Sequence, residues 1–163
     1  MNPNDFLQLA RKENAMLPST HDLEPGLTDE EFVSWRNRHP GVCLPDDLIL
    51  FLRQCNGFRL YPDPETPTGA VRLLPLREIE YAPRLLYAGN TNCDDRYPPF
   101  VYALTDDPDS AQHLVLDTAT GRYFDVDPIA GMEDEGLVGH NWPAGLDWIA
   151  KRAGLGRLLS RSF

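Results

Sequence analysis

The chain has 163 residues, of which 42% are hydrophobic and 25% are charged, and its 25 acidic and 15 basic side chains give a net charge of −10. This length predicts one domain with a substantial core, and the lack of a leader-like N-terminus or a long apolar run predicts a cytoplasmic protein without a membrane segment. The acidic balance argues against direct binding to nucleic acid or to anionic membranes, because both would repel the protein.

Two helices are predicted before residue 41. The first starts at a cap on Asn4, ends before Pro18, and has an inward face made of Phe6, Leu9 and Ala10. The second starts at Thr28-Asp29-Glu30-Glu31, which has the pattern of a capping box, and ends at His39-Pro40. Its inward residues are Phe32 and Trp35.

A third helix is predicted within residues 44–58, and it is the best defined element of the sequence. Pro45 suits the first helical position, and the next two residues are aspartates, which favour the positive end of the helix dipole. A single apolar stripe follows at helical spacing, made of Leu48, Phe51, Leu52 and Cys55. Asn56-Gly57 supplies residues that tolerate a left-handed C-cap, so this helix is interpreted as part of the core.

Strands dominate the middle of the chain, and a helix ends it. The predicted strands are Phe58 to Tyr61 and Val71 to Leu74, and two or three further antiparallel strands follow them before a final helix. This order predicts an α+β single domain: a mostly antiparallel central sheet with N-terminal helices and a C-terminal helix packed on it.

The third helix and the segments after it resemble the SUKH superfamily, which includes yeast cell-wall-synthesis regulators, many bacterial toxin-immunity proteins and some viral proteins. The residues that carry the resemblance are Leu44, Pro45, Asp46, Phe51, Leu52, Asn56, Gly57, Phe58, Asp117, Gly121 and Trp148. Their order and spacing agree over roughly residues 28–153, which the resemblance implies to be the core. The resemblance also implies a strand from Phe100 to Leu104, a hairpin of His113 to Asp117 and Gly121 to Val126 around Thr118-Ala119-Thr120, and a last helix from Pro143 to Ala153. The Pro-rich loop 61–70 and the basic tail 155–163 depart from the family pattern.

Catalytic and metal-binding patterns are weak. Oxygen-rich runs such as Asp106, Asp107 and Asp109 lack the Gly and Glu of an EF-type calcium loop, and the three cysteines lack zinc or disulfide spacing. Asp125 and Asp127 alternate along a strand, which fits a solvated face better than a hydrolase dyad. No nucleophile elbow, P-loop or dinucleotide fingerprint occurs. We therefore expect no enzyme activity, cofactor or metal.

Acidic residues concentrate in predicted loops, and they are the candidate partner-binding residues. They are Asp94, Asp95, Asp106, Asp107, Asp109, Glu133, Asp134 and Glu135. An acidic surface is steered quickly to a basic partner such as a nuclease toxin, and the resemblance makes a toxin-immunity protein the leading hypothesis. A regulatory scaffold of the cell-wall-regulator type is the alternative, and a small hydrolase using Asp125 is the third. The oligomeric state stays open.

Overall fold

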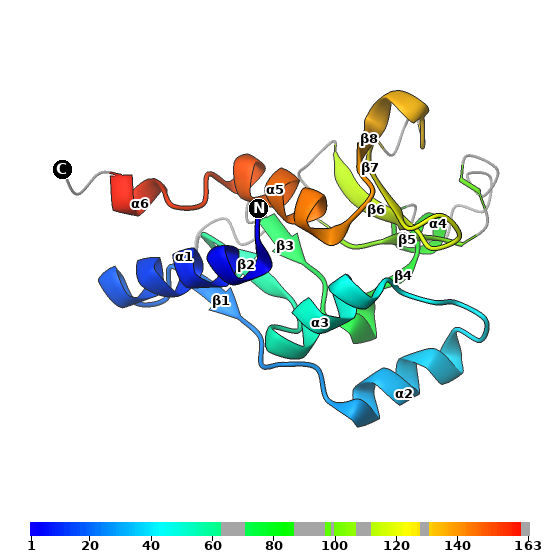
Figure 1. The fold of residues 1–163 in the computed structure, drawn as a ribbon, viewed down its shortest axis with the longest axis horizontal. Coiled ribbons are helices and arrows are strands. Elements are labelled where there is room, and N and C mark those ends of the chain that lie inside the picture. Colours follow the sequence, from blue (N-terminus) through cyan, green and yellow to red (C-terminus); the bar gives the residue numbers. More distant parts are fainter. Residues whose placement is uncertain (63–70, 87–96, 99, 107–111, 128–130, 161–163) are drawn as a thin grey trace.

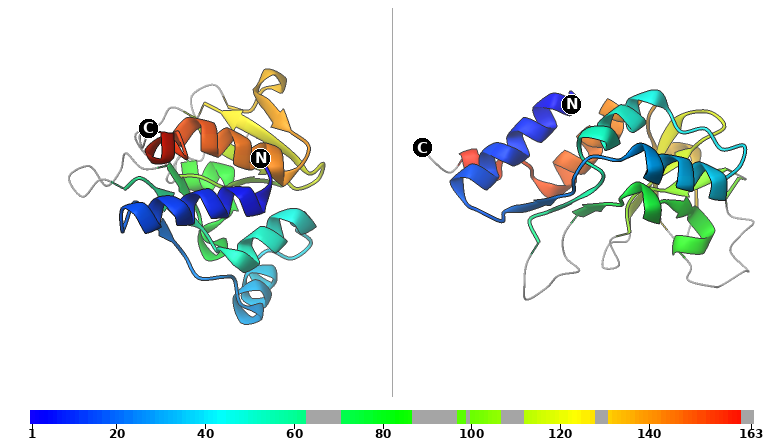
Figure 2. Two further views of the ribbon diagram at one scale, coloured as in Figure 1. Left: turned by 60° about the vertical axis from the view of Figure 1, so that its left-hand side comes forward. Right: turned by 90° about the horizontal axis from the view of Figure 1, so that it is seen from below.

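The structure is a computed structural model that describes residues 1–62, 71–86, 97–98, 100–106, 112–127 and 131–160. Helices and two antiparallel sheets form one α+β domain, which confirms the predicted fold class (Figure 1). Three helices, α1, α3 and α5, lie on one side of the strands (Figure 2). The predicted central sheet is divided into two smaller sheets.

The helices and strands follow one another in mixed order along the chain. The helices are α1 Pro3–Met16, α2 Asp29–Arg38, α3 Asp46–Gln54, α4 Ala82–Leu86, α5 Trp142–Ala153 and α6 Arg157–Ser160, with 3-10 turns η2 Leu76–Glu78 and η4 Asp134–Gly136. The strands are β1 His21–Leu23, β2 Phe58–Leu60, β3 Val71–Leu73, β4 Glu80–Tyr81, β5 Val101–Ala103, β6 His113–Asp117, β7 Arg122–Val126 and β8 Leu137–Gly139.

All strand pairs are antiparallel. The smaller sheet has the order β1-β2-β3 and the larger has the order β4-β5-β6-β7-β8. The sheets meet where Leu73 forms an isolated bridge with Thr105 and the Leu74 amide donates to the Leu104 carbonyl at 2.9 Å. The predicted hairpin β6–β7 is confirmed, with Asp117 opposite Arg122 and a turn in which Gly121 has a φ of +74°.

Aromatic side chains join the helices to the smaller sheet. Phe51 on α3 lies 6.0 Å from Phe6 on α1, 6.3 Å from Phe58 on β2 and 5.5 Å from Trp142 on α5, measured between ring centroids. The predicted stripe on α3 is buried, including Cys55, where burial raises the pKa of the thiol to about 11. A second apolar cluster covers the other face of the larger sheet, so every residue of β6 is buried.

The sequence-based description of α3 is correct in its core and wrong at both ends. Pro45 has extended backbone and precedes the first helical residue, and the C-cap is Cys55 rather than Asn56. Asn56 is buried and its side-chain oxygen accepts a hydrogen bond from the Leu76 amide at 2.9 Å. Gly57 has a φ of +99°, and a Cβ there would lie 2.7 Å from the Pro75 nitrogen. Asn56-Gly57 therefore joins α3 to η2 and does not cap the helix.

Other predicted boundaries hold with small corrections. Thr28 caps α2 through a complete capping box, as expected, whereas α1 is capped by Asn2 and not by Asn4. The inward face of α1 contains Phe6, Leu7, Ala10 and Glu13, so Leu9 was the wrong choice for that face. Six short elements were not predicted, and they are β1, β4, α4, η4, β8 and α6.

The first helix and the described residues after α5 both belong to the packed unit. Phe6 and Leu7 lie in the main core, and β1 is a strand of the smaller sheet, although both precede the 28–153 range of the resemblance. Part of the predicted basic tail forms α6, where the Leu158 amide donates to the Glu13 carboxylate at 2.8 Å. The described part of this tail is therefore attached to α1.

Candidate functional site

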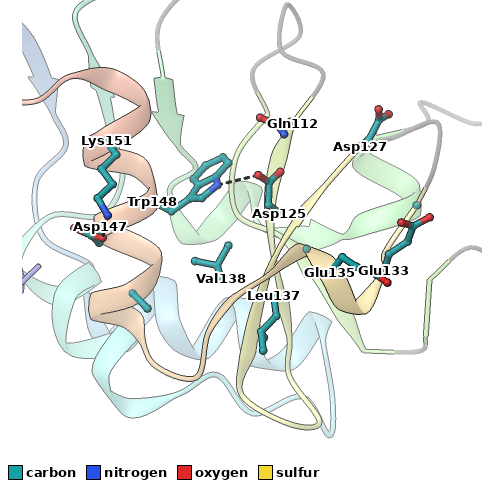
Figure 3. Close-up of a pocket in the computed structure, with 13 residues that line it drawn as sticks. Gln112, Asp125, Asp127, Glu133, Glu135, Leu137, Val138, Asp147, Trp148 and Lys151 are labelled. Atoms are coloured by element: carbon teal, nitrogen blue, oxygen red, sulfur yellow. Dashed lines mark hydrogen bonds and ion pairs between the residues drawn. The ribbon is translucent and has the colours of Figure 1, made fainter.

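A groove of about 560 Å³ lies between α5 on one side and β7, η4 and β8 on the other (Figure 3). Its apolar side chains come from Leu137 and Val138 on β8 and from Ala144 and Trp148 on α5. Carboxylates from three stretches of the chain surround them, at residues 125–127, 133–135 and 147. A second hollow, beside α2 and residues 39–46, contains none of the candidate partner-binding residues.

Close backbone packing shapes the groove. A Cβ at Gly136 would lie 2.3 Å from the Asp125 carbonyl oxygen, and one at Gly139 would lie 2.4 Å from the Ala144 Cβ. Only glycine allows the end of η4 to lie this near to β7 and the end of β8 to lie this near to α5. At the start of α5, Asn141 accepts a hydrogen bond from the Ala144 amide, and Asp47 of α3 accepts one from the Trp142 amide at 2.8 Å.

The groove is strongly acidic. Its ionisable side chains are Asp125, Asp127, Glu133, Glu135, Asp147 and Lys151, which give a net charge of −4 when all are ionised. Lys151 is paired with Asp147 at 2.8 Å, and this hydrogen bond lowers the pKa of the Asp147 carboxyl. Lys151 pairs with Asp147 and is the one basic side chain among the described residues that line the groove.

Trp148 lies in the wall of the groove and is held in one orientation. Its indole Nε1 donates to the Asp125 Oδ2 at 3.1 Å (Figure 3). The guanidinium carbon of Arg152 lies 5.3 Å from the centre of the indole ring, and Arg152 also donates to the Gln112 side-chain oxygen at 2.9 Å. An aromatic ring, a carboxylate and a cation are therefore adjacent at this end of the groove.

The structure divides the predicted acidic residues. Glu133 and Glu135 line the groove, and Asp134 lies between them in η4 with an exposed side chain. Asp106 lies elsewhere, where its carboxylate is 3.0 Å from Arg72, which also pairs with Glu78. The remaining four candidates lie outside the described residues, and they are Asp94, Asp95, Asp107 and Asp109.

Other groove residues were not recognised as one site from the sequence. Asp125 and Asp127 do share a face of β7, as their alternation predicts, but Asp147 joins them from a helix more than 20 residues away. Trp148 was assigned to the structural signature, and it both packs against the core and lines the groove. The net charge of the chain was the only sequence signal for this groove. It indicates an acidic surface but not where that surface lies.

The remaining signature residues have structural positions. Phe51 and Leu52 are buried, Leu44 is half-buried, and Asp46 is exposed in the first turn of α3. The Asp117 side chain accepts a hydrogen bond from the Ala119 amide at 2.9 Å and so stabilises the hairpin turn.

The described residues hold no group of three or more His, Cys, Asp or Glu side chains arranged to bind a metal ion. No histidine lines the groove, and Asp125 is engaged by the Trp148 indole. In the part of the chain that the structure describes, no helix is both long and apolar enough to cross a bilayer. The arrangement suits contact with a basic surface.

Comparisons with known proteins gave no match, either to a family model or to a curated protein sequence. The SUKH resemblance therefore stays a prediction that rests on the residues named above.

Proposed function

We propose that this chain is a non-enzymatic protein-binding domain that neutralises a basic partner, most specifically as the immunity protein of a cognate toxin domain. The observation that carries the proposal is the groove beside α5, where five carboxylates and one paired lysine surround apolar side chains. Interfaces that bind tightly combine an apolar centre with a charged rim. The resemblance to SUKH proteins supports an immunity role within this class.

The acidic groove should make association with a basic partner fast and sensitive to salt. Complementary charge raises association rates to on the order of 10⁸–10⁹ M⁻¹s⁻¹ at low salt, against about 10⁵–10⁶ M⁻¹s⁻¹ for neutral surfaces. Screening acts over about 8 Å at physiological ionic strength, so added salt should slow this association strongly. An immunity protein gains from rapid capture, because free toxin damages the cell that makes it.

The direct test is co-expression with the toxin domain encoded by the adjacent reading frame, followed by stopped-flow measurement of association at low and high salt. We expect rescue of growth, one-to-one binding and a steep fall of the association rate with salt. The double variant E133Q/E135Q removes two groove charges and should slow association at low salt. Absence of both binding and rescue contradicts the proposal.

A matched control removes two charges elsewhere. Asp22 and Glu30 have exposed side chains, and neither lines the groove. The variant D22N/E30Q therefore changes net charge by the same amount and should leave association nearly unchanged. Equal slowing by both double variants would show that total charge, and not the groove, controls binding.

The two alternative functions, a regulatory scaffold and a hydrolase, predict different experimental results. A regulatory scaffold would bind an endogenous partner without any toxin gene nearby. A hydrolase using Asp125 would lose its activity in D125N while the protein stays folded. Nothing in the groove favours the hydrolase, because the Asp125 carboxylate accepts a hydrogen bond from Trp148.

A further inference from the structure

We infer that the groove accepts an arginine side chain of the partner over the indole ring of Trp148, at the position that Arg152 occupies in the free protein. This inference rests on the proposed function in taking the groove as the binding face. It adds the chemistry of the partner group and the residue of this chain that must move.

The Trp148 ring is suited to hold a cation. Trp is the strongest cation–π partner among the aromatic residues, and this ring is half-buried against the core with one edge fixed by the bond to Asp125. The ring therefore needs no rearrangement to receive a ligand. The other two tryptophans, Trp35 and Trp142, are fully buried and offer no comparable surface.

Arg152 shows directly that this ring attracts a guanidinium. Its guanidinium carbon lies 5.3 Å from the ring centre, within the roughly 6 Å range of a cation–π contact. Arg152 is exposed, and its hydrogen bond to Gln112 is exposed as well. These two contacts are of an exposed kind that is weak, and a partner arginine over the ring replaces the first of them.

The groove favours an incoming arginine over an apolar residue. Glu133 and Glu135 have no side-chain hydrogen bond or ion pair to any described residue, and both line the same hollow as Trp148. A guanidinium can stack on an aromatic face and donate to a carboxylate at the same time, because it is planar and has five donors. A lysine ammonium provides the charge without the planar stacking surface.

The test uses short peptides and needs no toxin. An acetylated, amidated Gly-Arg-Gly-Arg-Gly peptide is titrated into the whole protein, with peptides that carry citrulline or lysine at both arginine positions as controls. Indole N–H signals are followed by NMR, and the Trp148 signal is identified by its loss in W148L. We expect the arginine peptide to shift this signal most, the lysine peptide less, and the uncharged citrulline peptide not at all.

A double-mutant cycle separates displacement of Arg152 from a simple change of charge. R152Q should bind the arginine peptide about two- to fivefold more tightly, the change that corresponds to an exposed cation–π contact. W148L lacks the Trp148 signal, so the affinities of the cycle are measured by isothermal titration calorimetry. In the W148L background the same R152Q change should give no gain, because no indole ring is left for the peptide to contact. R38Q, which removes a charge from the end of α2, should have little effect in either background. Circular dichroism and thermal melting check that W148L is folded, and W148F serves as a second variant with weakened binding.

The inference is overturned if the arginine and citrulline peptides shift the Trp148 signal equally, or if the lysine peptide matches the arginine peptide. It is also overturned if R152Q gains as much in W148L as in the native background. These outcomes leave rescue of growth untouched, so a protein that neutralises a toxin but fails this test binds its partner in another way. A protein that passes this test but rescues nothing refutes the proposed function alone.

Discussion

The buried Glu13 cluster and the acidic groove both place carboxylates beside aromatic side chains, yet they differ in how those carboxylates are paired. Glu13 is fully buried, and it accepts hydrogen bonds from the Tyr61 hydroxyl at 2.6 Å, from His21 Nε2 at 2.8 Å and from the Leu158 amide at 2.8 Å. In the groove, Glu133 and Glu135 are exposed. Their side chains pair with none of the described residues. The first carboxylate fixes the structure, and the others are available to a partner.

The geometry around Glu13 is determined by several elements at once. Tyr61 has a φ of +50°, which is rare for a bulky residue, and its amide donates to His21 Nδ1 at 3.3 Å. With Nδ1 accepting, Nε2 is the nitrogen that carries the proton toward Glu13. The Tyr61 hydroxyl also accepts a hydrogen bond from the Gly156 amide, and the Arg157 guanidinium lies 3.8 Å from the centre of its ring. This cluster joins α1, β1 and the end of β2 to the segment after α5.

Opposing effects act on the ionisation of the two partners. Burial alone would raise the pKa of Glu13, but the hydrogen bonds from Tyr61, His21 and Leu158 outweigh it and hold that pKa below its usual value. Burial and the bond to Glu13 raise the pKa of Tyr61 to about 12. Glu13 is therefore charged and Tyr61 neutral near pH 7. A buried carboxylate that accepts several hydrogen bonds can stay ionised in the core. Removing it takes the acceptor away from those donors, which is costly.

The largest expected effect is loss of Glu13. E13A removes the carboxylate that accepts from His21, Tyr61 and the Leu158 amide, and the Tyr61 hydroxyl keeps another acceptor, the Gly154 carbonyl at 3.1 Å. We expect E13A to lower the free energy of unfolding by about 3–5 kcal/mol, as for one partner of a buried pair. Urea denaturation followed by circular dichroism measures this. E30A, an exposed change on α2, should stay within about 0.5 kcal/mol. Similar losses in both variants would remove the distinction between buried and exposed carboxylates.

A smaller loss is expected for Tyr61. Y61F removes one hydroxyl that bonds both Glu13 and Gly156 but keeps the ring under Arg157, so we expect a loss of about 1–3 kcal/mol. Hydrogen exchange of the Leu158 and Gly156 amides should also become faster, because α6 loses part of its attachment. Unchanged exchange at both amides would show that the hydroxyl does not hold this segment.

The Glu13 cluster also predicts a pH dependence with a definite sign. Because the folded-state pKa of Glu13 lies below its usual value of 4.5, its contribution to stability is complete above that value and is lost as the pH falls through the folded-state pKa. The stability difference between the native chain and E13Q should therefore be constant near neutral pH and shrink on acidification below about 4.5. Denaturant titrations over this range measure the difference, and one that grows in acid contradicts the assigned direction.

The smallest effect on stability is expected in the groove. E133Q/E135Q should change the free energy of unfolding by no more than about 0.5 kcal/mol, since neither carboxylate is paired with a described residue and both are exposed. The same variant is expected to slow association with a basic partner. Thermal melting beside binding kinetics tests both. A large loss of stability would mean that these carboxylates support the fold and would weaken the contrast with Glu13.

Much of the local structure could be predicted from residue order. The stripe residues Leu48, Phe51, Leu52 and Cys55 recur at helical spacing, and all four are buried because a helix places them on one face. The capping box at Thr28 is likewise local, since its partner is three residues away. By contrast, β4 has only two residues, which is too short for any periodic pattern to be visible.

Residues whose partners are distant in the chain were misassigned or missed. Asn56 was interpreted as part of a helix cap, but its side-chain oxygen accepts a hydrogen bond from the amide of Leu76, 20 residues later. Glu13 was not considered for the interior, because an acidic residue is rarely buried without partners, and its partners come from three distant segments. Asp106 was grouped with the partner-binding acids, and its carboxylate accepts a hydrogen bond from Arg72, which is 34 residues earlier in the chain.

The sequence by itself determined the α+β class, the buried stripe of α3, the hairpin β6–β7 and the acidic excess of the chain. Each of these depends on composition or on residues close in the chain, where helix and strand periodicity fixes which side chains share a face. Only the tertiary structure decided which carboxylates are buried and which line one groove. Glu13 and Glu135 are the same residue type, and the difference between them arises because folding brings donors from His21, Tyr61 and Leu158 to the first and none from the described residues to the second.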